Sequence, residues 1–185
     1  MAWAQAPLLA PGGSLRAVIN VGNPILAQKD AAGRVTGVSV DLAQALAQRL
    51  KVPLVLKTVT SARQAVEAVT GDEADVGFFA IDPLRAQGIA FTTPYLLIEG
   101  SYLVRNDSPL QDNDEVDRSS HRVVVGQGSA YDLFLTRHLQ KAQLIRSATS
   151  PAVVDDFLRQ GYEVAAALQR HAIEGATVAP AGPMR

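Results

Sequence analysis

The first 80 residues alternate short apolar runs with amphipathic segments, and this alternation constrains the fold more than any other feature of the sequence. It predicts a strand, a helix, a strand, a helix and a strand at 15–21, 41–51, 54–59, 61–70 and 75–80. Strands that alternate with helices favour parallel βαβ units with right-handed crossovers. We therefore expect an α/β lobe whose sheet is mainly parallel.

Two local details of this lobe follow from residue type. The first helix carries leucines on the side opposite its polar residues, and we expect Leu42, Leu46 and Leu50 to face the sheet. Ser61 stands in capping-box spacing before the second helix, and Gly71 is placed to end that helix in a left-handed conformation.

A similar alternation returns in the second half, after a polar stretch at 106–120 that we interpret as a surface loop with at most one helical turn. The pattern predicts a strand, a helix and a strand at 122–125, 131–142 and 143–148, and a further helix that opens at Ser150 and Pro151. His138 lies on the apolar face of its helix, so we expect a partly buried side chain there.

Composition excludes several classes of function. A net charge of −1 gives no basic excess for nucleic acid, and the absence of cysteine excludes disulfide scaffolds and Cys-ligated zinc. The three histidines have no partners at metal-ligand spacing, so we expect no metal and no cofactor. No apolar run approaches the length of about 18 residues that a membrane span needs. The chain should therefore be peripheral to a membrane at most.

Arg85 stands out because it follows the apolar run at 75–80 directly after a break at Asp82 and Pro83. Proline lacks an amide donor and ends strands, so residues 84–87 should begin a short helical turn. An arginine just past the carboxyl end of a strand points at the crevice where open α/β sheets bind ligands, and its planar fork matches a carboxylate. The alternative is a surface arginine paired with Asp82.

A second candidate anion site lies where the strand at 122–125 meets its helix. Gly126, Gly128 and Ser129 stand at this turn, where glycine lets backbone amides approach an anion and the helix offers its positive end. A lone Gly-x-Gly is weak evidence for a ligand, and Ser129 could be a plain N-cap.

Two segments together resemble a known family. The order "DVGFFAIDPLRAQGIAFTTPY", preceded by "GRVTGVSVDLAQALAQRL", resembles the extracytoplasmic solute-binding proteins of amino-acid-type ABC transporters. The resemblance runs from about residue 15 to 135 and returns at the tail. It implies the two-lobe periplasmic binding protein type II fold, an α/β fold with a mainly parallel, helix-flanked sheet in each lobe. Ser39 departs from the family, which usually has an acidic residue there.

The resemblance also implies domain limits. We expect an N-terminal tail at 1–14, a first lobe at 15–98 with hinge residues Glu99 and Gly100 at its end, and a second lobe at 99–160. Residues 161–185 have two interpretations: a second-lobe strand, or the family's last helix and tail returning to the first lobe. We favour the helix, which implies that an internal block between about residues 155 and 161 is missing and that the second lobe is incomplete.

Eight residues are expected to contact the ligand by resemblance. Arg85 would bind its carboxylate from the first lobe, and the turn of Gly128, Ser129 and Ala130 would grip it from the second. Ala130 stands where the family has a hydroxyl. The remaining candidates line the first lobe: Asn23, Phe78, Phe79 and Ala80. Asn23 before Pro24 is also a common turn former, and Phe78 and Phe79, which replace the family's usual Ser or Thr, could belong to the core.

The function implied is capture of a small carboxylate-bearing solute between two lobes, followed by delivery to an ABC-transporter permease in the periplasm, with no catalysis. The motif Ala4-Gln5-Ala6 has the form of a signal-peptidase site. Two alternatives use the same fold. One is an enzyme like the cyclohexadienyl or arogenate dehydratases, with Asp82 or Glu99 as acid or base, and the other is a ligand-sensing domain of a receptor.

Overall fold

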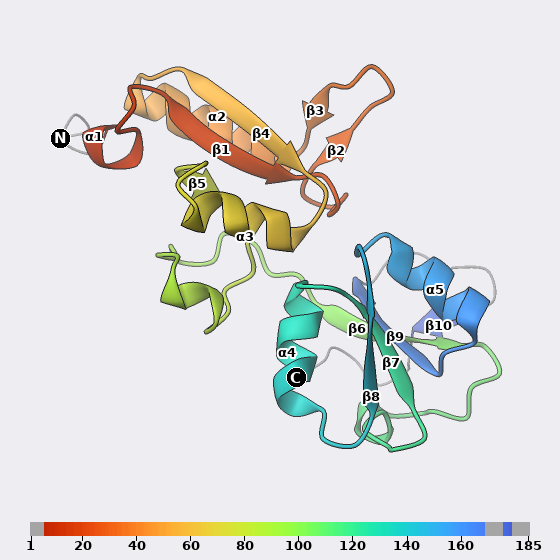
Figure 1. Ribbon diagram of the computed structural model, residues 1–185. Helices are drawn as coiled ribbons and strands as arrows, with labels where there is room; N and C mark the ends of the chain where they lie inside the picture. The colour runs from red at the N-terminus through yellow and green to blue at the C-terminus, as the bar shows by residue number, and fades with distance from the viewer. Residues whose placement is uncertain (1–5, 169–175, 179–185) are drawn as a thin grey trace. The chain divides into compact units, whose positions relative to one another are not determined.

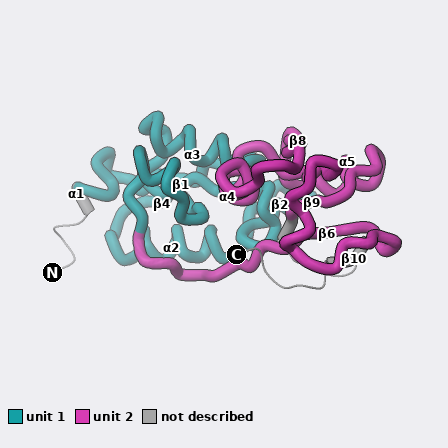
Figure 2. The backbone as a smooth tube through the Cα atoms, turned by 90° about the horizontal axis from the view of Figure 1, so that it is seen from below, with its two compact units in different colours: residues 1–91 teal, residues 92–185 magenta. Residues whose placement is uncertain are grey.

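The computed structural model describes residues 6–168 and 176–178. The chain divides into two compact units, Met1–Phe91 and Thr92–Arg185 (Figure 2). The sequence placed the end of the first lobe at residue 98, so the observed division falls earlier in the chain. Residues 4 and 5 of the A-x-A motif lie outside the described residues. His171 and most of the C-terminal tail lie outside them as well.

Unit 1 has the predicted alternation (Figure 1). Its elements in order are α1 (Ala6–Leu9), β1 (Leu15–Asn20), β2 (Gln28–Lys29), β3 (Val35–Thr36), α2 (Val38–Leu50), β4 (Leu54–Val59), α3 (Ala62–Thr70), β5 (Val76–Gly77) and the 3-10 turn η1 (Arg85–Gln87). The sheet has the order β4-β1-β5 with every pair parallel, and β2 and β3 form a separate small hairpin.

Helices α2 and α3 cover opposite faces of this sheet (Figure 1). Helix α2 packs Ala47 and Leu50 against Leu15, and α3 packs Ala65 and Ala68 against Val18. The expected leucine face is wrong in part, because Leu42 is exposed. Small side chains face the sheet instead, since they allow the helix axis to approach the strands closely.

The start of α3 confirms the predicted cap. Ser61 Oγ accepts a hydrogen bond from the Gln64 amide at 3.2 Å, and Gln64 Oε1 accepts one from the Thr60 amide at 3.1 Å. The end differs from the prediction, because Gly71 has φ −90° and the left-handed residue is Asp72 with φ 58°. Asp tolerates this conformation better than most residues because its short side chain bonds locally.

The strand predicted at 75–80 is much shorter than expected, since β5 contains only Val76 and Gly77. Gly77 is required there by close approach: a Cβ on this residue would lie 2.4 Å from Cζ of Phe79. The Phe79 ring therefore folds back over the strand, and the chain leaves the sheet.

Unit 2 contains β6 (Gly100–Arg105), the 3-10 turn η2 (Asn113–Glu115), β7 (Arg122–Gly126), α4 (Ala130–His138), β8 (Gln143–Ser147), α5 (Ala152–Gln160), β9 (Val164–Leu168) and β10 (Ala176–Val178). The sheet order is β10-β6-β9-β7-β8, in which β6 runs antiparallel to both its neighbours and the others are parallel. Helix α4 packs Leu135 on one face with Val123 and Val125, and α5 packs Phe157 on the other with Val124. The α/β prediction is thus confirmed in both units.

Two expectations for unit 2 need correction. Residues 164–168 form β9 in the middle of this sheet, so the interpretation set aside, a second-lobe strand, is the one that the structure contains. Helix α5 precedes this strand and runs unbroken to its left-handed cap Gly161. Second, α4 ends at His138, which is exposed and stacks on Phe134 instead of lying in the core.

Candidate functional site

Asn23 lies in the turn that follows β1 and acts there as a turn former. Its side-chain oxygen accepts a hydrogen bond from the Ile25 amide at 3.3 Å, and its carbonyl accepts from the amides of Leu26 and Ala27. This arrangement closes the chain on itself by the Asx mechanism. Asn23 is therefore a turn former, which is one of the two roles expected for it.

The three candidates after β5 differ in their surroundings. Phe78 packs against the core on the α2 side, with Ile19 and Val40, and Phe79 packs on the α3 side, with Val18. Both rings are only partly buried, whereas Ala80 is exposed. The two aromatic side chains thus belong to the packing of unit 1, which is the second of the two interpretations given for them above.

Arg85 occupies the first position of η1 and is 5% exposed, next to Asp82 at 4%. It donates a hydrogen bond from Nη1 to the Ala80 carbonyl at 3.2 Å. Asp82 Oδ1 accepts from the Leu84 amide at 2.8 Å and so shapes the turn. Burial lowers the pKa of the Arg85 guanidinium, and the negative charge of Asp82 opposes that shift. Arg85 is therefore no surface arginine, and its cation is held beside the Ala80 carbonyl, in the segment that follows β5.

The turn between β7 and α4 brings Gly128, Ser129 and Ala130 together at the start of the helix. Gly128 has φ 69°, a conformation that favours glycine. Ser129 is 6% exposed and caps α4, because its Oγ accepts from the Asp132 amide at 3.1 Å. In turn, Oδ2 of Asp132 accepts a hydrogen bond from the Gly128 amide at 2.8 Å. The N-cap role of Ser129 is confirmed.

Sequence reasoning missed two residues at this turn, Asp132 and Arg146. Asp132 could have been found, since Ser129-x-x-Asp132 has the same cap spacing that identified Ser61 and Gln64. Arg146 gives no such signal. It lies on β8, and only the pairing of β8 with β7 brings its Nε to 2.8 Å from Asp132 Oδ1.

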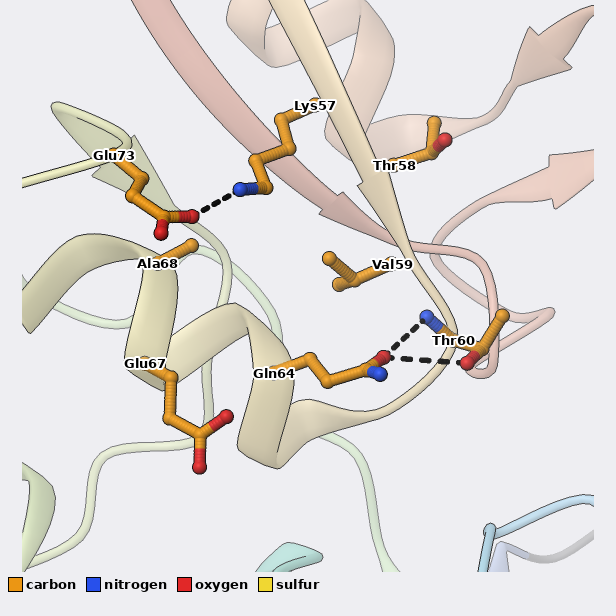
Figure 3. A pocket seen from close by; sticks show the side chains of 8 residues that line it. All are labelled: Lys57, Thr58, Val59, Thr60, Gln64, Glu67, Ala68 and Glu73. Atoms are coloured by element: carbon orange, nitrogen blue, oxygen red, sulfur yellow. Dashed lines mark hydrogen bonds and ion pairs between the residues drawn. The ribbon is translucent and has the colours of Figure 1, made fainter. Parts of the chain in front are cut away.

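Unit 1 also has a surface hollow of about 460 Å³ between β4 and α3 (Figure 3). Its walls are mixed in charge, and the lining residues are Lys57, Thr58, Val59, Thr60, Gln64, Glu67, Ala68 and Glu73. Lys57 and Glu73 point toward one another and form an ion pair. None of the predicted ligand residues lines this hollow.

Comparison with known proteins decides the family. A profile of the bacterial extracellular solute-binding proteins, family 3, matches residues 15–172. The chain belongs to this family. The match spans both units, so the resemblance seen in the two sequence segments extends over most of the protein. No curated protein matches the chain by sequence.

Solved structures with the same fold include several amino-acid-binding proteins. A binding component of an ABC transporter from Wolinella succinogenes, complexed with lysine, aligns with TM-score 0.77 and 20% identity over 93% of this chain and 78% of its own. An arginine-bound mutant of ArgBP from T. maritima aligns with TM-score 0.79 and 18% identity over 96% and 86%. The ancestral amino acid-binding protein AncCDT-1, a precursor of cyclohexadienyl dehydratase, aligns with TM-score 0.73 and 20% identity over 89% and 74%.

These likenesses establish the two-lobe type II fold for this solute-binding protein. Part of each neighbour has no counterpart in this chain, and the internal shortening inferred from the sequence remains a prediction. Within residues 6–168 and 176–178, no helix has both the length and the apolar character of a membrane span. The same part of the chain holds no group of three His, Cys, Asp or Glu side chains suited to a metal ion.

Proposed function

We propose that this solute-binding protein captures a small carboxylate-bearing solute, an amino acid or a close relative, between its two lobes and delivers it to an ABC-transporter permease. The observation that carries the proposal is the family match over residues 15–172. A protein of an extracellular family works outside the cytoplasm, and we place this one in the periplasm. The ligands of the lysine-bound and arginine-bound neighbours support the solute class.

On unit 1, the ligand carboxylate would be bound by Arg85. A guanidinium with two parallel donors recognises a carboxylate more strongly than a neutral group does, and burial strengthens the interaction. An analogue without the carboxylate would lose these charge-assisted hydrogen bonds and should bind much more weakly. Phe78 and Ala80 would line the same pocket, while the Phe79 ring supports it from the core.

On unit 2, the ligand would meet the start of α4. The Gly128 amide already donates to Asp132, so it is not the donor for the ligand. Ser129 Oγ accepts from the Asp132 amide and keeps its own proton to donate. The Ser129 hydroxyl and the Ala130 amide are therefore the donors that we assign to this side.

The test is a thermal-shift screen of the purified chain against the twenty amino acids, small dicarboxylates and prephenate, with calorimetric titration of any compound that stabilises it. A ligand that binds only the native state at 100 times its Kd adds about 2.7 kcal/mol of stability. Stabilisation by amino acids alone supports the proposal. A protein that melts cooperatively and binds no compound carrying a carboxylate refutes it.

Arg85 gives the sharper test. Arg85→Ala should abolish binding of the solute found in the screen, and Arg85→Lys should weaken it severalfold, because an ammonium lacks the planar fork. Both variants should also melt at a lower temperature, since Arg85 packs beside the buried Asp82. Arg63→Ala is the matched control, an exposed arginine of α3 paired with Glu67. Unchanged affinity in folded Arg85→Ala would rule out the clamp.

A second candidate is a dehydratase, because one structural neighbour is a precursor of cyclohexadienyl dehydratase. Asp82 is a poor acid or base, since it is buried and its Oδ1 shapes the turn at Leu84. Glu99 is exposed and remains available to this candidate. Conversion of prephenate or arogenate, followed by ultraviolet absorbance, tests it. Turnover that Glu99→Gln abolishes would favour the enzyme.

A further inference from the structure

We infer that Arg146 is a positioning residue for the α4 turn: it neutralises Asp132 so that the turn accepts a carboxylate. The inference rests on the proposed function, because it concerns the side of the site that unit 2 supplies. It assigns a role to two side chains that do not touch the solute themselves.

Asp132 is the centre of the arrangement. Its side chain is 8% exposed, and its two oxygens accept from the Gly128 amide at 2.8 Å and from Thr136 Oγ1 at 3.2 Å. Its own amide donates to Ser129 Oγ. The carboxylate of Asp132 therefore holds the turn at Gly128 and the second turn of α4, while the backbone amide of the same residue completes the cap at Ser129.

This carboxylate also creates an electrostatic problem. It lies in the first turn of α4, where the amides of Ala130 and Tyr131 have no hydrogen-bond partner among the described residues. Those two amides form the positive end of the helix, to which a ligand carboxylate would bind. A second negative charge so close to a poorly solvated first one is unfavourable.

Arg146 solves this problem from the neighbouring strand. Its Nε donates to Asp132 Oδ1 at 2.8 Å, and its Nη2 donates to Thr136 Oγ1 at 2.8 Å. The two bonds run from β8 to α4 and fix the guanidinium against the helix. The pair of Arg146 and Asp132 is neutral as a whole, so the amides of Ala130 and Tyr131 keep their attraction for an anion.

The experiment uses acetate as the smallest carboxylate and follows the amides of Ala130 and Tyr131 by ¹H–¹⁵N NMR in the full chain. Arg146→Met should weaken acetate binding at these amides about fivefold to tenfold, because Asp132 is then a lone negative charge. Arg146→Lys should stay within about twofold of the natural protein. Arg159→Met is the matched control, since it breaks another Arg–Asp pair of unit 2, in the last turn of α5.

Removing both charges separates positioning by charge from support by packing. Asp132→Asn/Arg146→Met should recover most of the affinity that Arg146→Met loses, and Asp132→Asn alone should bind acetate more tightly than the natural protein. A purely structural role predicts the opposite order, with the double variant weakest, and that order would overturn the inference. If Arg146→Met does not fold, the acetate affinity of Asp132→Asn alone decides the question: tighter binding supports the inference, and weaker binding overturns it.

The amino-acid screen keeps this inference separate from the proposed function. If no amino acid stabilises the chain while acetate moves the two amides in the predicted order, the solute assignment fails and the role of Arg146 stands. If amino acids bind but acetate leaves Ala130 and Tyr131 unmoved in the natural protein, the turn is not the carboxylate site and the inference fails.

Discussion

The two units build the same core from different sequences. Each has a central strand between two parallel neighbours, in the orders β4-β1-β5 and β8-β7-β9, with helices on both faces. Each also has an arginine at the start of the central strand that pairs with a carboxylate just before the third strand. These pairs are Arg16 with Asp75 and Arg122 with Glu163.

The pairs match in detail. In both, the carboxylate accepts from the arginine's own amide at 2.8 Å and from its Nε and Nη2. The register also matches, since Val76 pairs with Ala17 as Val164 pairs with Val123. The carboxylate therefore sets where the third strand begins relative to the first in each unit.

The third strands nevertheless differ in length. Strand β9 extends over Val164–Leu168 and pairs with β6 as well as β7, whereas β5 contains two residues and pairs only with β1 among the described residues. A strand between two neighbours gains hydrogen bonds on both edges. A second neighbouring strand, rather than apolar sequence, therefore decides how far such a strand continues.

The largest loss of stability from a single substitution is expected in α5 of unit 2, because α5 and α3 face their sheets with side chains of different size. Phe157 of α5 is fully buried, whereas α3 faces its sheet with Ala65 and Ala68. Phe157→Ala should destabilise unit 2 by about 3–5 kcal/mol, from lost burial and a cavity. Urea unfolding followed by circular dichroism, with hydrogen exchange resolved by unit, measures it. Equal loss of protection in both units would mean that they unfold together.

The carboxylates of the two pairs, Asp75 and Glu163, should contribute unequally to the free energy of unfolding. Asp75 is 7% exposed and Glu163 is 28% exposed as side chains, so solvent screens the second pair more. Asp75→Asn should cost about 2 kcal/mol and Glu163→Gln about 1 kcal/mol, after allowance for that screening. Equilibrium unfolding of both variants checks the order. The reverse order would show that Asp75 is not the stronger anchor.

Gly77 and Ala165 occupy the same register in β5 and β9, opposite Val18 and Val124. Gly77→Ala makes the two strands alike at this position, but its Cβ would meet the Phe79 ring. We expect a loss of about 1 kcal/mol, because the ring must move out of its packing. A stabilised Gly77→Ala protein would instead indicate that the ring moves freely.

The smallest effect concerns pH. Hydrogen bonds from Arg122 lower the pKa of Glu163 to about 2, against an ordinary value of 4.5. A depressed pKa means that the carboxylate stabilises the folded state above the unfolded pKa, and that this contribution is lost as pH falls from about 4.5 toward 2. The melting temperature should therefore drop less across this range in Glu163→Gln than in the natural protein. An identical drop in scanning calorimetry would assign the acid sensitivity to other carboxylates.

Much of each unit could be predicted because the signals are local. Apolar periodicity, the Ser61 cap and the proline after Asp82 act within a few residues, and the elements they predict are present. The exposed Leu42 was missed for a different reason. Periodicity identifies an apolar face, but close packing of α2 on the strands favours the small residues beside it.

The sequence by itself determined most of the order of strands and helices, the cap at Ser61, the resemblance to the family and the position of an arginine after β5. Only the tertiary structure decided that β5 stops at Gly77, that residues 164–168 form a strand, and that Arg146 lies against Asp132. Each of these outcomes depends on a partner distant in the chain. A sequence pattern reports what a segment prefers alone, whereas sheet neighbours and charge partners are set by how the segments pack.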